Sequence, residues 1–90
     1  MAMPELDSII EYPLEFPVKV MGLNRPEFVP AMTAVFLRHA PEFDASTIVV
    51  RESREAKYLS LTMSINAVSR QQLDALYSEL SDHPMVTMAL

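Results

Sequence analysis

The chain has 90 residues, enough for one small domain, and half of them are hydrophobic although only 8% are aromatic. We therefore expect an aliphatic, methionine-rich core. The net charge of −5 argues against a nucleic-acid partner, because affinity for phosphate backbones depends on cationic contacts. The absence of cysteine excludes a disulfide framework, a thiolate metal site and a catalytic thiol.

The sequence also carries no signal for a membrane or for secretion. Its uninterrupted apolar runs never exceed four residues, too few to span a bilayer. The first residues lack the basic region and the hydrophobic segment of a secretory signal. We expect a cytoplasmic protein with no membrane partner.

Residues 1–14 are predicted to form an N-terminal tail, and residues 15–90 a single domain. Pro4 and Pro13 interrupt the tail, which leaves room for one helical turn at Asp7 to Tyr12. Such a turn would bring Ile9, Ile10 or Tyr12 against the domain.

The first predicted strand begins at Phe16, because Phe16, Val18 and Val20 alternate with less apolar residues. It is expected to stop at Gly22, the only glycine in the chain. Since glycine tolerates positive φ, we predict the tightest turn there.

A first helix is predicted after this turn, with Asn24 and Glu27 as a capping box. Pro30 fits poorly in a regular helix, so either the first turn is distorted or the regular helix begins nearer Pro30. Pro41 should end the helix. Its apolar stripe and its additional alanines and leucine predict burial on more than one side; the stripe comprises Met32, Val35, Phe36, His39 and Ala40.

A second strand is predicted at Ile48–Arg51, and a loop of several residues at Ser53–Lys57, which contains no glycine. Residues 58–67 then give the strongest signal in the chain, a strict alternation of apolar and polar side chains. This pattern predicts a central strand with one buried face and one polar face.

A second helix should follow, capped by Ser69 with Gln72, because apolar residues recur at helical spacing from Leu73 to Leu80. A last strand is predicted over residues 85–90, with Val86, Met88 and Leu90 on one face and Met85, Thr87 and Ala89 on the other. Met85 and Thr87 are expected on the face turned away from the helices, which leaves Met88 on the covered face.

The β-α-β-β-α-β order predicts an α+β fold, the ferredoxin-like sandwich, with a four-stranded antiparallel sheet and both helices on one face. The opposite face is left open, and its mixture of methionine and hydroxyl side chains is typical of a surface that another molecule partly covers. We predict an interface there, formed by Lys19, Met21, Tyr58, Ser60, Thr62 and Ser64.

Other uses of this fold find less support in the sequence. RNA binding would need aromatic residues where the central strand has Ser60 and Thr62. A small phosphatase with Arg25 and Asn66 would need an anion cradle of free N–H groups, and the loop from Gly22 to Pro26 is short for one. No catalytic residue, cofactor or metal site is predicted, and His39 fits a helix C-terminus without a catalytic role.

Several segments together resemble the YbeD family of small bacterial proteins. The most specific are Lys19-Val20-Met21-Gly22 and Arg38-His39-Ala40-Pro41. They are joined by Phe16-Pro17, residues 58–62, Ile65-Asn66-Ala67, Leu76-Tyr77 with Leu80 and Pro84, and Met88-Ala89-Leu90. The family usually has a glycine-containing turn before the tyrosine of the third strand, where this chain has residues 53–57.

The resemblance implies an ACT-like version of the fold, similar to the regulatory domain of a serine-biosynthesis dehydrogenase, and an association with lipoate metabolism. In ACT domains, effectors bind near the turn after the first strand. Carried onto this chain, a ligand site would comprise Met21, Gly22, Leu23 and Asn24.

The leading hypothesis is a non-enzymatic regulatory or interaction module. It would work by self-association as a homodimer, or by docking a protein partner, through the open sheet face. The alternative is a sensor that binds a small-molecule effector at the turn after the first strand.

Overall fold

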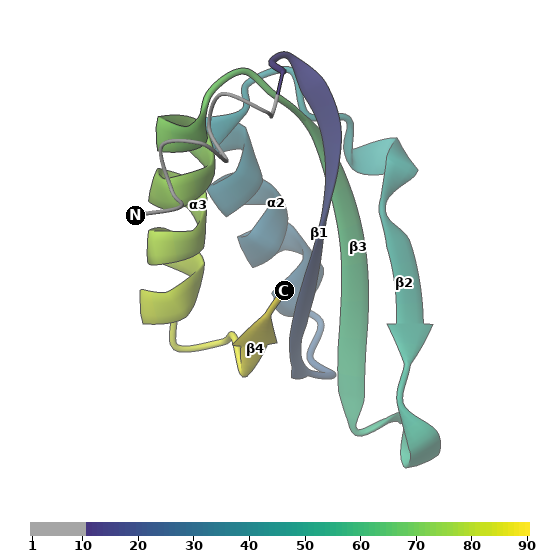
Figure 1. The fold of residues 1–90 in the computed structure, drawn as a ribbon. Helices are drawn as coiled ribbons and strands as arrows, with labels where there is room; N and C mark the ends of the chain where they lie inside the picture. The colour runs from purple at the N-terminus through teal and green to yellow at the C-terminus, as the bar shows by residue number, and fades with distance from the viewer. Residues whose placement is uncertain (1–10) are drawn as a thin grey trace.

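The computed structural model describes residues 11–90 and contains one open sheet with two helices packed against the same face (Figure 1). Within the sheet the strands lie in the order β2-β3-β1-β4, and every neighbouring pair is antiparallel. The predicted ferredoxin-like α+β fold is confirmed. In chain order the elements are β1 (Leu14–Leu23), α2 (Phe28–His39), η1 (Ala45–Thr47), β2 (Val49–Glu52), η2 (Arg54–Ala56), β3 (Tyr58–Ala67), α3 (Arg70–Asp82) and β4 (Met88–Ala89).

β3 occupies the position that its alternating sequence predicts. It pairs along its whole length with β1, from Tyr58 opposite Leu23 to Ala67 opposite Leu14. On its other side it pairs with β2. Its apolar residues are all buried beneath the helices: Leu59, Leu61, Met63, Ile65 and Ala67.

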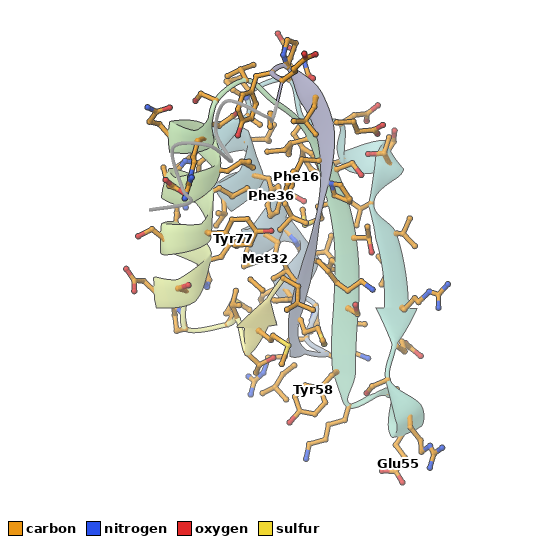
Figure 2. The ribbon with its side chains drawn as sticks, viewed as in Figure 1. Phe16, Met32, Phe36, Glu55, Tyr58 and Tyr77 are labelled. Atoms are coloured by element: carbon orange, nitrogen blue, oxygen red, sulfur yellow. The ribbon has the colours of Figure 1, made fainter. Side chains whose placement is uncertain are left out.

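The core lies between this face of the sheet and the two helices. Figure 2 shows Met32, Phe36 and Tyr77 pointing into this space. Two methionines, Met32 and Met63, are fully buried, as expected, together with the rings of Phe28 and Phe36. Each large apolar side chain buried in this way contributes about 1.5–3 kcal/mol relative to an exposed one.

The start of the first helix differs from the predicted capping box. The N-cap is Glu27, no side chain caps the helix, and α2 begins at Phe28. The alternative start nearer Pro30 is therefore correct, and Pro30 lies in the first turn, where a missing N–H costs little. Asn24 instead binds the β2–β3 turn: its side-chain amide donates to the Ala56 carbonyl and its main-chain N–H to the Lys57 carbonyl, both at 2.9 Å.

The predicted tight turn at Gly22 is wrong. β1 continues to Leu23, and Gly22 does not have a positive φ. The reason for glycine is space, because a Cβ here would lie 2.4 Å from the Met85 carbonyl oxygen and 2.5 Å from the ring of Phe28. Positive φ occurs in η2 instead, at Glu55 (67°) and Ala56 (58°). These two residues lie in the several-residue loop that was predicted between β2 and β3.

The second helix matches its prediction. Ser69 Oγ accepts from the Gln72 N–H at 3.1 Å, and the Gln72 side-chain oxygen accepts from the Val68 N–H at 2.7 Å. The first bond satisfies a donor that the helix itself leaves free, and the second fixes the chain just before the N-cap.

The last strand is shorter than predicted and its faces are reversed. β4 covers only Met88–Ala89, with further main-chain bonds at Thr87 and Leu90. Met88 pairs with Met21, and Leu90 exchanges main-chain bonds with Lys19, so both lie on the open face although they were expected on the covered face. The short stretch is anchored to β1, and that pairing sets its faces.

The outer side of α2 is also less buried than expected. Leu37 is 41% exposed and Ala34 is exposed, so the described chain covers this helix on its core side alone. At the N-terminus, Tyr12 packs against the core, and neither Glu11 nor Tyr12 is helical; residues 7–10 of the predicted helical turn lie outside the described residues. Among residues 11–90, no helix combines the length and hydrophobicity required to cross a bilayer.

Candidate functional site

The sheet face turned away from the helices contains all six residues predicted to form an interface. Directly paired residues share a face, so the register of β1 with β3 places Lys19 beside Thr62 and Met21 beside Ser60. On the same face, Tyr58 lies opposite Leu23, and Ser64 lies opposite Pro17. The structure thus brings these residues together on one surface; their role as an interface stays a prediction.

Four apolar side chains form a continuous patch at one end of this face, which we call the open-face patch: Met21, Leu23, Tyr58 and Met88. Met21 pairs with Met88 across β1 and β4, and Leu23 pairs with Tyr58 across β1 and β3. Leu23 is 37% exposed, Tyr58 36% and Met88 49%. The sequence prediction omitted Leu23 and Met88 from the interface. The period of two along β1 would have placed Leu23 on the same face as Met21. The face of Met88 depends on how β4 pairs with β1, which the sequence of β4 does not fix.

Cations surround the open-face patch. Lys19 and Arg51 point from the same sheet face, opposite Thr62 and Ser60 respectively. The Lys57 ammonium lies 5.7 Å from the centroid of the Tyr58 ring, within the range of a cation–π contact. In a chain of net charge −5, this is a locally basic surface with an apolar centre.

The residues predicted to bind a ligand occupy different environments. Leu23 lines a hollow of about 420 Å³ together with Arg25, Glu27, Pro84, Met85 and Thr87. Gly22 is buried against Phe28, Asn24 is hydrogen-bonded to the β2–β3 turn, and Met21 belongs to the open-face patch. The ligand site also stays a prediction.

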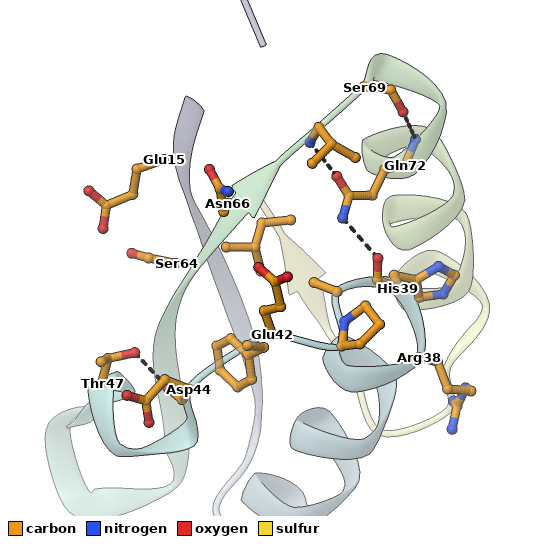
Figure 3. A pocket seen from close by; sticks show the side chains of 15 residues that line it. Glu15, Arg38, His39, Glu42, Asp44, Thr47, Ser64, Asn66, Ser69 and Gln72 are labelled. Carbon is orange, nitrogen blue, oxygen red and sulfur yellow. Dashed lines mark hydrogen bonds between the residues drawn. The ribbon is translucent and has the colours of Figure 1, made fainter. Parts of the chain in front are cut away.

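A larger hollow, of about 1000 Å³, lies at the opposite end of the sheet between β3, the end of α2 and the start of α3 (Figure 3). Several of its polar groups already hold the chain together. Gln72 donates from its side-chain nitrogen to the His39 carbonyl at 2.8 Å, in addition to its capping bond. Asp44 accepts from the N–H and the hydroxyl of Ser46, and these bonds lower the pKa of Asp44.

The Arg38-His39 motif at the edge of this hollow joins the two helices. Arg38 donates to one oxygen of Glu79 on α3, and His39 Nε2 lies 2.7 Å from the other oxygen. The hydrogen bond from Arg38, followed by that with His39, holds the pKa of Glu79 below its usual value. The same pairing raises the pKa of Arg38. The motif therefore has a structural task, in keeping with the position predicted for His39 at a helix C-terminus.

The phosphatase alternative does not fit the structure. Asn66 pairs with Glu15 at one end of β1, while Arg25 follows the other end of that strand. Eight residues of extended chain separate Glu15 from Leu23, a distance of about 26 Å at roughly 3.3 Å per residue. Within residues 11–90, no group of three or more histidine or carboxylate side chains is arranged to hold a metal ion.

Comparison with known proteins places the chain in a family. A family model described as "Protein of unknown function (DUF493)" matches residues 7–90. A UPF0250 protein of Nitrosomonas europaea is 51% identical over 84 residues, which cover 93% of this chain and 97% of that protein. UPF0250 proteins of Bordetella pertussis and a Janthinobacterium species are 47% identical over 87 residues and 52% identical over 91 residues. These matches cover 97% and 98% of this chain, and 96% and 100% of those proteins. The resemblance seen in the sequence motifs is confirmed: the chain belongs to the YbeD family, whose members are the UPF0250 proteins described by the DUF493 model.

Proposed function

We propose that this protein is a non-enzymatic interaction module that docks a partner protein on its open sheet face. The observation that carries this proposal is the open-face patch, in which Leu23, Tyr58 and Met88 are each more than a third exposed and lie side by side with Met21. Contiguous apolar surface of this kind, surrounded by polar residues, is typical of protein-binding sites.

The charges around the patch indicate the chemistry of the partner. Lys19, Arg51 and Lys57 surround an apolar centre, so a complementary segment would present apolar side chains flanked by carboxylates. Tyr58 and Met88 would supply most of the binding energy, because aromatic and methionine side chains are enriched in the cores of interfaces. The rim cations would mainly accelerate encounter and exclude basic partners.

The large hollow at the other end of the sheet supports this function less well. Its polar side chains include Gln72, Asp44 and His39, all of which are engaged in hydrogen bonds within the fold. A partner that bound there would have to compete with bonds that position α2 and α3.

Affinity capture with matched variants tests the proposal. Met88→Glu introduces a carboxylate into the open-face patch, whereas Val68→Glu introduces one at an apolar residue that is at least as exposed and follows the far end of β3. We expect the wild type and Val68→Glu to retain the same partner and Met88→Glu to lose it. Equal capture by all three chains, or no specific capture by any, would count against the proposal.

A second candidate function is small-molecule sensing at the turn after β1. The hollow beside Leu23 favours it, since this cavity of about 420 Å³ offers Arg25 and Glu27 as polar anchors next to Met85 and Pro84. Lipoic acid is the first probe, because the sequence resemblance implied an association with lipoate, and amino acids are the second. A ligand at 100 times its dissociation constant should add about 2.7 kcal/mol to the stability. A thermal-shift assay measures this gain, and Leu23→Asp should lose it. If no compound in the panel stabilises the protein, small-molecule sensing at this hollow is not supported.

A further inference from the structure

β2 is exposed on both of its faces. All four of its residues are exposed, and Val49 and Val50 retain 51% and 49% of their accessible surface. Figure 1 shows why, because β2 stands at the edge of the sheet away from α2 and α3. In the described chain it pairs with β3 alone. Natural edge strands are usually shielded by shortness, charge, proline or bulges, and β2 is short and ends in the charged residues Arg51 and Glu52. Its Val49-Val50 half carries no charge, proline or bulge and is the part left open to pairing.

The hydrogen-bonding directions along β2 follow from one bond at its end. Ser53 donates its N–H to the Tyr58 carbonyl at 2.9 Å, so the main chain of Ser53 faces β3. Bonding directions alternate along an antiparallel strand, and Arg51 and Val49 therefore also face β3. Val50 and Glu52 direct their N–H and C=O groups to the free edge. Ile48 directs its carbonyl there, while its own N–H donates to Ala45.

We propose that β2 pairs antiparallel with β2 of a second copy of this chain, around a twofold axis at Val50. A twofold axis perpendicular to the sheet keeps both helix layers on the same side, so outward-facing residues meet outward-facing residues. In this register the two Val50 residues exchange N–H···O=C bonds, and each Glu52 N–H reaches the Ile48 carbonyl of the other copy. Val49 lies opposite Arg51 of the second copy, and no like charges face each other.

The neighbouring registers are less favourable. A twofold axis at Arg51 would place the two Arg51 guanidinium groups directly opposite each other, which destabilises a strand pair. An axis at Val49 would place Glu52 opposite Ser46, which lies in the 3₁₀ turn η1 and is not extended. Val50 is thus the centre at which this edge is complementary to itself.

The resulting assembly would have one eight-stranded sheet with both open-face patches on the same side. It uses the edge of the sheet, so it stands apart from partner docking on the open face. A strand pair of this length buries less than the roughly 1,200 Å² of a standard stable interface, so the dimer should be weak and should form at high protein concentration. A method that traps it is therefore needed.

Cysteine substitution provides that method, because the chain has no cysteine of its own. Bonded residues in an antiparallel pair have Cα atoms about 5.5 Å apart, a distance that a disulfide spans. Under mild oxidation we expect Val50→Cys to form a covalent dimer faster than Val49→Cys and Arg51→Cys. Val68→Cys, at a position away from β2 that is at least as exposed as Val50, provides the background rate.

A second measurement avoids the disulfide. Val50→Lys places two ammonium groups at the proposed axis, and sedimentation velocity at high concentration should show loss of the dimer relative to wild type and Val68→Lys. Met88→Glu should dimerise like wild type, which separates this proposal from docking on the open face. A Val50→Cys chain that crosslinks no faster than Val68→Cys, or a Val50→Lys chain that associates like wild type, would overturn the inference. Preferential crosslinking at Val49 or Arg51 would overturn the Val50 register.

Discussion

β2 and β3 are neighbours with similarly apolar residues but very different environments. Val50 and Leu61 are direct partners across the two strands and project on the same side of the sheet. Leu61 is completely buried, whereas Val50 is 49% exposed, because the helices extend over β3 and stop short of β2. The position of a strand beneath the helices, and not its own hydrophobicity, therefore decides whether it contributes to the core.

The largest effect that this comparison predicts is a difference between Leu61→Ala and Val50→Ala. Leu61→Ala should lower the free energy of unfolding by about 2–5 kcal/mol, since it leaves a cavity in a packed core. Val50→Ala should change it by no more than about 0.5 kcal/mol, as expected for an exposed position. Chemical denaturation of dilute protein measures both values. Similar losses for the two variants would mean that β2 is covered in solution even at low concentration.

Gly22→Ala tests how tightly the covered face is packed at the end of β1. The new methyl group would lie 2.4 Å from the Met85 carbonyl oxygen and 2.5 Å from the Phe28 ring, closer than van der Waals contact, so its neighbours must move. Overpacking of this kind costs about 1–3 kcal/mol. Denaturant unfolding checks the value.

A second substitution tests the stated cause. In a Phe28→Leu background the ring is gone, so the additional loss caused by Gly22→Ala should be smaller than in wild type. An unchanged loss would point to the Met85 carbonyl as the main obstacle. A neutral Gly22→Ala would contradict the close packing described here.

The sequence predicted well whatever depends on the period of its side chains. The alternation of residues 58–67 identified β3 and its buried face, and Ser69 with Gln72 identified the start of α3. The sequence predicted poorly where a contact with a residue distant in the chain decides what a side chain binds. Asn24 has the spacing of a helix cap, yet it binds Ala56, 32 residues further along the chain.

The same division applies to the candidate site. All six predicted interface residues lie on the long paired stretch of β1 and β3, where the period of two settles their face. Met88 was placed on the wrong face because β4 pairs with β1 through only two residues, Met88 and Ala89. The two hollows were not foreseen, since each is formed by loops and helix ends from separate parts of the chain.

The turn between β2 and β3 allows a stabilising substitution that sharpens the comparison of the two strands. Glu55 has φ of 67°, a conformation that costs a non-glycine residue about 1–2 kcal/mol. Glu55→Gly should remove this cost and lose about 0.5–1 kcal/mol of it again through the greater freedom of glycine in the unfolded chain. We expect a net gain between about 0 and 1.5 kcal/mol in thermal or denaturant unfolding. Arg54→Gly, in the same turn but without positive φ, should give no gain.

The smallest effect concerns the contact between the two helices that cover the sheet, and it depends on pH. Hydrogen bonds from Arg38 and His39 lower the pKa of Glu79 below its usual value of 4.5. As the pH falls, Glu79 is therefore protonated in the unfolded chain before it is protonated in the folded chain. The stabilisation is therefore present above pH 4.5 and is lost as the pH falls below that value. Glu79→Gln should be less stable than wild type at neutral pH, and the difference should shrink in acid. Because Glu79 is partly exposed, solvent screening keeps the effect small. Unfolding curves between neutral pH and acid measure the stability of both chains. Arg38→Gln should cost less stability in a Glu79→Gln chain than in the wild type, because its partner is already gone. If the difference between Glu79→Gln and wild type stays constant down to acid pH, the carboxylate does not stabilise the helix pair.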